Sequence, residues 1–574
     1  MGTISDKLMR IINTKEDIRQ ALISKGYDVP TSIPFKEYAK MILDLPCNAD
    51  SFPDIEGIVA RYSASGLTNE QMAANPVWVD KTGNGHDLQL KNFSWKGMSG
   101  IGGYVVDIDE WGTNSTAAYF ERNSIKITAT FKENASLGLL YHNIKLRQSC
   151  VLKVTGIPEG CDAFLDDRLG NRFYMSEDGV YEIIPSNFLA EALYLSIEKY
   201  PERWYGSKLT VEQLPLYPGA LVFDGVDDYG VCDNFPILTK EKGYTVVALR
   251  QWITYNPNAI SAIATNASDQ SFNGAFTFEN YNKGAEQTIS YGATQITLQY
   301  SKSPFFWQTT SKYNGVNIAN GNKDATNSLV LGRSYPQRNE FANFAIWELV
   351  FLDHDATEEE LTKIKDYFVK TYPWLFPDQA WTVTGKTNED EDRATIANIT
   401  GNGNDLVLSN FGFAEGSGYN EEGEYAGYLV TDGVDDKIVS SSFGMGKDFT
   451  IVGDWKFIDN KKSGTGLVKG SSFYIYNTMI GLDLYINSGS VKNSLDGIKS
   501  INAACSDGRA YDRNWNEILA NTGNVVGSGG MLEVSSSGGR FDRIAFKNLA
   551  IYPRILSKDD CIKAYNYLQT LKAK

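Results

Sequence analysis

Two spacings of hydrophobic residues divide the chain. Over residues 1–50 apolar positions recur at helical spacing, as Leu8 and Ile11 illustrate. Beyond this segment the pattern changes to short alternating strands punctuated by Gly, Asn, Ser and Asp, which is typical of an all-β protein. Helical spacing returns at 356–372 and 557–574. The pattern predicts a mainly β protein with a short α-helical N-terminal segment and two later helices.

Four sequence phrases occur twice in the strand-rich region, in the same order both times. The pairs are GLTNE at 66–70 with GKTNE at 385–389, TGNGHDLQLKNF at 82–93 with TGNGNDLVLSNF at 400–411, FDGVDDY at 223–229 with TDGVDDK at 431–437, and the stretch 341–361 with 541–561. Repeated phrases in a fixed order indicate an internal duplication. We therefore predict two homologous β modules in tandem, each ending in a short helix.

The first copy carries roughly 110 residues more than the second between its TGNG and DGVDD phrases, enough for an independent domain. This extra segment is itself strand-patterned, which predicts a small β-sandwich whose ends lie close together. Pro373 and Pro377 stop the preceding helix and predict a module boundary nearby. The predicted domains are 1–50, 51–111 with 216–374, 112–215 as the insert, and 375–574.

The repeated TGNG phrase has the composition of a turn that leads into a strand. Gly83 and Gly85 permit positive φ angles, and Asp87 can hydrogen-bond the turn backbone. Leu88 and Leu90 then alternate as a half-buried strand. No helical pattern follows the glycines, so the phrase is not a phosphate-binding loop.

Composition narrows the classes of partner. The chain has 574 residues and a net charge of −16, which disfavours nucleic acid because phosphate backbones are repelled. No run approaches the about 18 apolar residues of a membrane-spanning helix, so we expect no membrane insertion. The N-terminus has neither a long apolar core nor a small-residue cleavage site, which predicts a protein made in the cytoplasm without an export signal.

Cysteine and histidine usage limits the chemistry further. The six cysteines are Cys47, Cys150, Cys161, Cys232, Cys505 and Cys561. None forms a CxxC pair, so a zinc site is not expected. Cys150 and Cys161 could pair within one module, but six free thiols in a reducing cytoplasm is the favoured interpretation. Three histidines leave little material for His-based catalysis.

The DGVDD turns are the candidate metal sites, because their carboxylates are the hard oxygen ligands that calcium prefers. The two sets are Asp224, Asp227 and Asp228 in the first copy and Asp432, Asp435 and Asp436 in the second. The alternative, which we favour, is that Gly225 and Gly433 make a structural turn between two strands. No cofactor is therefore predicted, and calcium remains the alternative.

Aromatic residues supply candidate glycan-binding positions, because Tyr and Trp present flat apolar faces on which sugar rings can stack. The candidates are Trp95, Trp204, Tyr205 and Trp515. Each has a plain structural alternative, since most aromatic side chains of a β protein belong to its core.

The repeated phrases resemble a known family. In chain order, DxTGNGxDLxL, FDGVDDY, YTVVALRQW, LVLGR and FANFAIWELVFLDHDATEEELTKI resemble the laminin-G-like, concanavalin-A-like lectin and glucanase domains. The resemblance covers 51–111 with 216–374 and, more loosely, 375–574. It implies tandem concanavalin-A-like β-sandwiches, the first of them interrupted by the inserted β domain.

The N-terminal stretch TKEDIRQALISKGYDVPTSIPFKEYAKMI is similar to a helical segment near the N-termini of tailed-phage virion proteins, notably tail and fibre proteins of phages of gut Bacteroidales. Together the two resemblances imply a virion structural protein, fibre- or tail-associated, whose lectin-like modules bind host surface glycan. They also imply attachment to other virion proteins through the N-terminal helices and a homo-oligomer, a trimer by analogy. The alternative is a purely architectural head or tail decoration protein.

The fold implied by the resemblance also includes glycoside hydrolases, which work with paired carboxylates. The nearest stretch is VVDIDEW, with Asp107, Asp109 and Glu110. Strand alternation places the two aspartates on one face and Glu110 on the other, and the second copy has no matching acidic strand. We therefore predict that the chain is not an enzyme, with a polysaccharide-degrading hydrolase as the second alternative.

Overall fold

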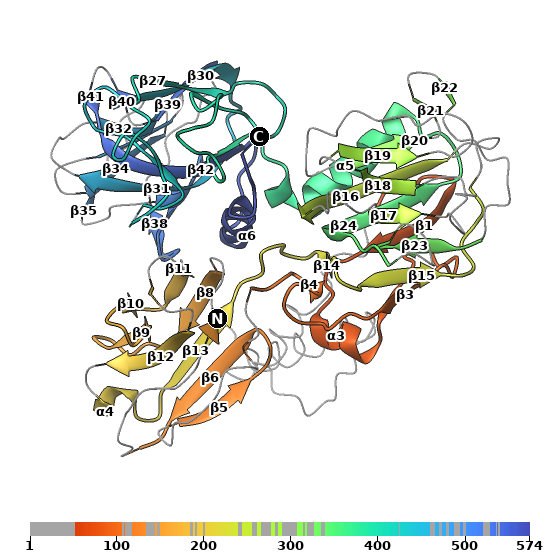
Figure 1. Cartoon of the computed structure of the whole chain (residues 1–574), viewed down its shortest axis with the longest axis horizontal. Coiled ribbons are helices and arrows are strands. Elements are labelled where there is room, and N and C mark those ends of the chain that lie inside the picture. Colours follow the sequence, from red (N-terminus) through yellow and green to blue (C-terminus); the bar gives the residue numbers. More distant parts are fainter. Residues whose placement is uncertain are drawn as a thin grey trace, which may run out of the picture.

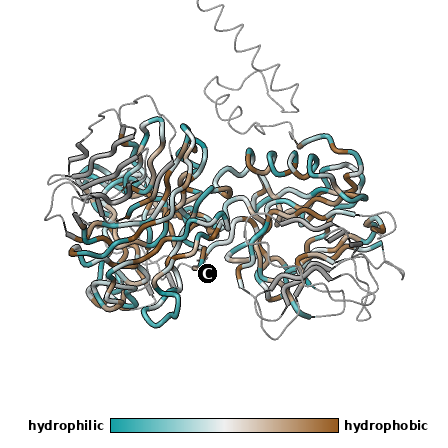
Figure 2. The backbone as a smooth tube through the Cα atoms, turned by 90° about the horizontal axis from the view of Figure 1, so that it is seen from above, coloured by the Kyte–Doolittle hydropathy of each residue, from teal (hydrophilic) through white to brown (hydrophobic). Residues whose placement is uncertain are grey.

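The computed structural model describes residues 52–573 with gaps, of which the longer are 109–117, 134–143, 255–260, 266–276, 290–306, 318–326, 487–493 and 520–528. The N-terminal segment predicted to be helical lies outside the described residues. The described part is mainly β, as the alternation predicted, with antiparallel sheets and few helices (Figure 1). Along many strands in Figure 2, hydrophobic and hydrophilic residues alternate, as expected for sheets with one face in a core.

Two sheets from either side of the insert pack face to face as the first sandwich. The first sheet contains β20 (Trp307–Thr310), β16 (Thr245–Thr254), β24 (Asn343–Leu352), β14 (Leu221–Asp224), β4 (Gly100–Ile101) and β1 (Ile58–Ser63). The second contains β19 (Ala285–Ile289), β18 (Thr277–Tyr281), β17 (Ser261–Thr265), β23 (Leu329–Leu331), β15 (Tyr229–Cys232), β3 (Leu88–Lys91) and β2 (Val77–Trp78). Helix α3 (Asn69–Ala74) and the hairpin of β21 (Lys312–Tyr313) and β22 (Val316–Asn317) complete it. Phe223 and Phe344 meet Leu88 and Leu331 in the core between the sheets.

The second sandwich is built in the same way from two sheets. One contains β28 (Gly418–Asn420), β29 (Tyr428–Val430), β42 (Arg543–Tyr552), β31 (Thr450–Asp459), β36 (Ile501–Cys505), β37 (Arg509–Asp512), β38 (Glu517–Leu519) and β25 (Gln379–Thr382). The other contains β26 (Thr395–Ile396), β27 (Leu406–Ser409), β30 (Lys437–Gly444), β39 (Gly529–Val534), β32 (Thr465–Lys469), β33 (Phe473–Asn477), β34 (Gly481–Ile486) and β35 (Ser494–Asp496). A small ladder joins β40 (Ser536–Ser537) to β41 (Arg540–Phe541).

The strand order repeats from one sandwich to the other. The long last strand, β24 or β42, lies between β14 and β16 in the first and between β29 and β31 in the second, and β1 or β25 also pairs with it. The strands of the two opposing sheets also correspond in order. In the first sandwich they are β2, β3, β15, β23, β17, β18 and β19, and in the second they are β26, β27, β30, β39, β32, β33 and β34. The duplication in sequence is therefore a duplication in topology.

The last strand of each sandwich is apolar on both faces. In β24, nine of the ten residues are buried, and β42 is similar. One face of β24 lies in the core between the sheets, and the other, with Trp347 and Val350, contacts Ile364 and Phe368 of α5 (Glu358–Thr371). Because both faces are covered, the strand loses the polar alternation expected of a half-exposed strand.

The insert forms two sheets of its own. One contains β10 (Arg172–Met175), β9 (Asp162–Asp166), β12 (Ala192–Glu198) and β7 (Ile144–Lys145), and the other contains β11 (Gly179–Ile183), β8 (Cys150–Thr155), β13 (Lys208–Gln213), β6 (Lys126–Phe131) and β5 (Ala118–Arg122), with α4 (Pro201–Trp204) beside them. Leu165 and Leu195 meet Leu152 and Val211 in its core. Its two ends are joined by a hydrogen bond from the Leu216 amide to a carbonyl at residue 103, at 2.9 Å. This closure lets the insert sit between two strands of the sandwich without separating them.

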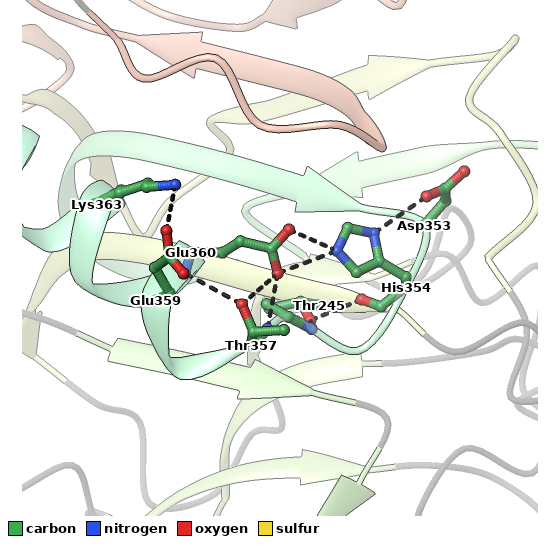
Figure 3. A network of polar contacts seen from close by, with 8 residues as sticks. Thr245, Asp353, His354, Thr357, Glu359, Glu360 and Lys363 are labelled. Atoms are coloured by element: carbon green, nitrogen blue, oxygen red, sulfur yellow. Dashed lines mark hydrogen bonds and ion pairs between the residues drawn. The ribbon is translucent and has the colours of Figure 1, made fainter.

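The turn between β24 and α5 is held by a polar network (Figure 3). The hydroxyl of Thr245 donates to the carbonyl of His354 and accepts the amide N–H of Ala356, both at 2.8 Å. Thr357 and Glu360 form the capping box that begins α5. The imidazole of His354 lies 3.2 Å from Glu360, so this histidine completes the turn.

The corresponding turn of the second sandwich has the same hydrogen bonds. The hydroxyl of Thr450 donates to the carbonyl of Arg554 and accepts the amide N–H of Leu556, both at 2.9 Å. Ser557 caps α6 (Lys558–Leu568) by accepting the amide N–H of Asp560. The turn therefore depends on a threonine in a neighbouring strand, which the local sequence of the turn does not contain.

Within the described part of the chain, no helix is long and apolar enough to cross a membrane.

Helix α6 lies where the three units meet (Figure 1). It faces its own sandwich through Tyr565, and its Tyr567 packs edge-on against Trp347 of the first sandwich with ring centroids 5.9 Å apart. Val180 of the insert belongs to the same hydrophobic cluster. The short helix η3 (Pro373–Leu375) also contributes, since Trp374 and Leu375 are buried there. The segment at the predicted module boundary is therefore part of a shared core.

Candidate functional site

The DGVDD turn of the first sandwich connects β14 to β15 and is organised by one buried carboxylate. Asp228 is fully buried, and its Oδ2 accepts the Asp224 amide N–H at 3.0 Å while its Oδ1 accepts the Ser99 hydroxyl at 2.9 Å. Asp224 in turn accepts the amide N–H of Val226 at 2.7 Å. Gly225 has a φ of +76°, and a Cβ there would lie 2.7 Å from Asn343 Cβ. The turn therefore requires glycine at this position for both conformation and space.

The loop after β3 is tied to this turn and forms the other half of a rim. Asn92, at the end of the TGNG strand, has a φ of +68° and donates from Nδ2 to the carbonyl of Asp227 at 3.0 Å. Ser99 accepts the Ser94 amide N–H at 2.9 Å while donating to Asp228. We call the loop 92–99 together with the turn 224–229 the first rim.

The second sandwich repeats the arrangement as the second rim, residues 410–417 and 432–437. Asp436 accepts the Asp432 amide N–H at 2.7 Å and the Ser417 hydroxyl at 3.0 Å. Asn410 donates to the carbonyl of Asp435 at 3.0 Å. The serine and asparagine in each rim were missed in the sequence analysis. Their signal is visible when the two copies are aligned, because both follow the TGNG phrase at the same offsets.

Each rim gathers three carboxylates whose nearest oxygens lie within 4.8 Å of one another. In both, one aspartate is half-buried, one is exposed and one is buried. The buried member already accepts an amide N–H and a serine hydroxyl, and the half-buried member accepts turn amides. Through these hydrogen bonds, four of the six rim carboxylates stabilise the turn in which they lie. The two exceptions are Asp227 and Asp435. Calcium at either rim stays the alternative to a purely structural turn.

Burial dominates the titration of the two central aspartates. It raises the pKa of Asp228 to about 7, and the charge of Asp224 adds to the effect. Burial likewise raises the pKa of Asp436 to about 6. A carboxyl whose pKa is higher in the folded state binds its proton more tightly there. Its contribution to stability is present below pH 4 and is lost as the pH rises through the folded pKa.

Asp228→Asn is expected to flatten the pH dependence of stability. The asparagine can accept the Asp224 amide N–H and donate to Ser99, but it carries no charge to desolvate. Relative to wild type, the variant should gain about 3 kcal/mol in free energy of unfolding between pH 5 and pH 8. Urea unfolding at both pH values measures this difference. Asp436→Asn should show a smaller gain, complete by about pH 7, and Asp227→Asn serves as the exposed control. Equal pH profiles for wild type and Asp228→Asn would contradict the assignment.

An aromatic side chain lies on each rim. Trp95 is half-buried and stacks on Phe93 with ring centroids 4.8 Å apart. Its φ is +57°, a conformation that costs a non-glycine residue about 1–2 kcal/mol. Phe413 occupies the same place in the second rim with a φ of +49°, and the guanidinium of Arg393 lies 5.1 Å from its ring centroid. The same strained backbone conformation at both rims costs free energy locally, and the surrounding loop holds the residue in that conformation.

Two of the four predicted glycan-binding aromatics are wrong. Trp204 is fully buried in the core of the insert, where its ring lies 5.0 Å from that of Phe131. Trp515 is also buried and packs edge-on against Tyr565 of α6 at 5.6 Å. Neither ring can be reached by a sugar. Tyr205 is half-buried beside α4, so only Trp95 lies on a rim.

Asp107, Asp109 and Glu110 lie outside the described residues. Ile108, between the two aspartates, is buried in the core of the insert.

No protein-family model matches the chain, and no curated protein matches it. Solved structures do. A mutant of Trypanosoma rangeli sialidase displaying trans-sialidase activity matches with 10% identity and a TM-score of 0.27 over 41% of this chain and 42% of that chain. Trypanosoma rangeli sialidase in complex with the inhibitor DANA matches with 9% identity and a TM-score of 0.26 over 82% and 94%. The binding domain of botulinum neurotoxin serotype G matches with 9% identity and a TM-score of 0.22 over 59% and 94%.

These matches correct one prediction. Sialidases are enzymes, so these matches contradict the prediction that the chain is not an enzyme. The first of these structures is matched over less than half of its length. At TM-scores of 0.22 to 0.27 the superpositions assign no activity and no ligand to this chain.

Proposed function

We propose that this chain is a fibre- or tail-associated structural protein of a phage virion, and that its two concanavalin-A-like sandwiches bind host surface glycan at their rims. The observation that carries the binding part is the duplicated rim. Each rim holds a partly exposed aromatic ring, Trp95 or Phe413, and one exposed carboxylate, Asp227 or Asp435. Rings stack on the apolar faces of sugars, and carboxylates accept hydrogen bonds from sugar hydroxyl groups. Two such rims on one chain would also raise affinity through avidity.

Assembly is the other part of the proposal. The N-terminal segment, predicted to be helical, would attach the chain to other virion proteins and support a homo-oligomer, and the host glycan would be the external partner. The shared core around α6 supports this arrangement, because it joins the two sandwiches through one hydrophobic cluster. The architectural alternative needs the same joined sandwiches but no ligand.

Substitution of the rim aromatics should weaken glycan binding. Trp95→Ala and Phe413→Ala together are expected to reduce binding to a panel of bacterial surface polysaccharides more than about tenfold, taking for each ring the about 1–3 kcal/mol that an aromatic side chain contributes when a nucleic-acid base stacks on it. Tyr119→Ala is the matched control, because Tyr119 is 67% exposed on the insert and lies outside both rims. Glycan-array and calorimetric measurements with the full chain give the result.

The outcomes separate the alternatives. Binding that survives the double substitution removes the rims as the site. Absence of binding by wild type to every polysaccharide of the panel supports the architectural protein. Release of reducing ends from a bound polysaccharide would instead assign a glycoside hydrolase reaction.

A further inference from the structure

Each TGNG turn places an asparagine directly before a glycine at the protein surface. The residues are Asn84 and Gly85 in the first sandwich and Asn402 and Gly403 in the second, and all four are exposed. The two glycines have φ angles of +82° and +74°. Neither glycine amide donates a hydrogen bond to another of the described residues. Each amide nitrogen is therefore available to react with the side chain that precedes it.

The two asparagine side chains fasten their turns to a strand of the same sandwich. Asn84 donates from Nδ2 to the carbonyl of Val59 in β1 at 3.0 Å. Asn402 donates from Nδ2 to the carbonyl of Asp378, immediately before β25, at 2.7 Å. Both strands pair with the long last strand of their sandwich. The stability of the turn thus depends on the side-chain amide of one exposed asparagine.

Two other asparagines of the rims provide an internal comparison. Asn92 and Asn410 are also exposed, and each donates from Nδ2 to a backbone carbonyl at 3.0 Å. Each of them precedes a phenylalanine instead of a glycine. A side chain on the following residue crowds its amide nitrogen, whereas glycine has no Cβ to do so. The four asparagines therefore differ chiefly in the accessibility of the next amide nitrogen.

We infer that Asn84 and Asn402 are modification sites at which the side-chain amide is lost by spontaneous deamidation. The glycine nitrogen attacks Cγ of the preceding asparagine, and the new C–N bond closes a succinimide ring. The bond between Cγ and Nδ2 breaks, and Nδ2 leaves as ammonia with the proton of the glycine amide. Water then opens the ring at either carbonyl and gives aspartate or isoaspartate. Water is the sole co-reactant, and nothing is oxidised or reduced.

The product detaches the turn from the strand. A carboxylate accepts hydrogen bonds but cannot donate one, so its contact with the backbone carbonyl becomes repulsive. In the second sandwich the new carboxylate would also face Asp378, whose Oδ1 lies 3.5 Å from the present Nδ2 of Asn402. Deamidation should therefore destabilise the second sandwich more than the first.

Peptide mapping of the full-length wild-type chain during incubation at mildly alkaline pH tests the inference. The peptides that contain Asn84 and Asn402 should each gain about 1 Da, at least about tenfold faster than those that contain Asn92 and Asn410. The rate should increase with pH, because the attacking nitrogen must lose its proton. Asn84→Gln and Asn402→Gln should each abolish the gain in their own peptide, because the longer side chain closes a larger ring less readily.

Asn84→Asp and Asn402→Asp measure the effect of the product. Each should lower the melting temperature by roughly 1–4 °C, with the larger decrease for Asn402→Asp. Equal rates at all four asparagines, or a gain confined to the other Asn-Gly pairs at 273, 314 and 320, would overturn the assignment of the sites. Aspartate variants as stable as wild type would overturn the proposed detachment of the turn.

Discussion

Glu182→Ala is expected to lower the free energy of unfolding by about 3–5 kcal/mol, because it leaves a buried ammonium group without its main partner. Glu182 lies on β11 of the insert, and its carboxylate is 3.2 Å from the Nζ of Lys547 on β42 of the second sandwich. Both side chains are buried, with 6% and 12% of their surface exposed. The Tyr565 hydroxyl of α6 adds a contact to Glu182 at 3.4 Å. The substitution therefore removes an ion pair that joins two units of the structure.

The groups around this pair determine its charge state. Burial by itself would raise the pKa of Glu182, but Lys547 and Lys456 together hold it below its usual value. Asp454 lies 3.9 Å from Lys547 and accepts the Tyr428 hydroxyl at 2.9 Å, so part of the compensation for Lys547 persists in the variant. Since the folded pKa of Glu182 is lowered, its contribution is present above the usual carboxyl range and is lost as the pH falls through the folded value.

A double-substitution cycle distinguishes the ion pair from the packing. Lys547→Met should cost a similar amount, and Glu182→Leu with Lys547→Met should recover much of it, because apolar residues of similar size need no desolvation of charge. Urea unfolding of wild type, Glu182→Leu, Lys547→Met and the double variant gives the coupling energy, which we expect to exceed about 1 kcal/mol. A cost below about 1 kcal/mol for Glu182→Ala, as for an exposed ion pair, would show that the insert and the second sandwich do not meet in solution as they do here.

Tyr567→Ala is expected to cost about 3–5 kcal/mol, the usual range for truncating a fully buried aromatic side chain. Tyr567 belongs to α6 at the end of the second sandwich, yet its ring packs edge-on against Trp347 on β24 of the first. The loss should therefore appear in both sandwiches. Differential scanning calorimetry, with limited proteolysis after residue 375 as a second readout, shows whether the two now unfold separately.

Two matched variants make this result specific. Tyr567→Phe keeps the ring and should retain most of the stability, whereas Lys558→Ala changes an exposed position of the same helix and should cost less than about 0.5 kcal/mol. If Tyr567→Ala behaves like Lys558→Ala, α6 does not bury its apolar face against the first sandwich, and the shared core is contradicted.

The sequence by itself determined the structural features that depend on residues adjacent in the chain. Alternation identified β3 and β27, where Leu88, Leu90, Leu406 and Leu408 are buried as expected. The glycines of the TGNG and DGVDD phrases have the positive φ angles that their turn composition predicted. The helices near 358 and 558 begin within two residues of the predicted starts. Each of these features follows from local periodicity or turn stereochemistry, and the repeated phrases extended them from one sandwich to the other.

Only the tertiary structure decided which side chains are covered. Trp204 and Trp515 were predicted as candidate glycan-binding aromatics. Both are buried because partners distant in sequence, Phe131 and Tyr565, pack on them. The contacts of Lys547 with Glu182 and of Tyr567 with Trp347 join residues separated by hundreds of positions. No local pattern records such contacts, because a residue's periodicity reports which face of an element it occupies, whereas burial depends on what that face meets after the chain has folded.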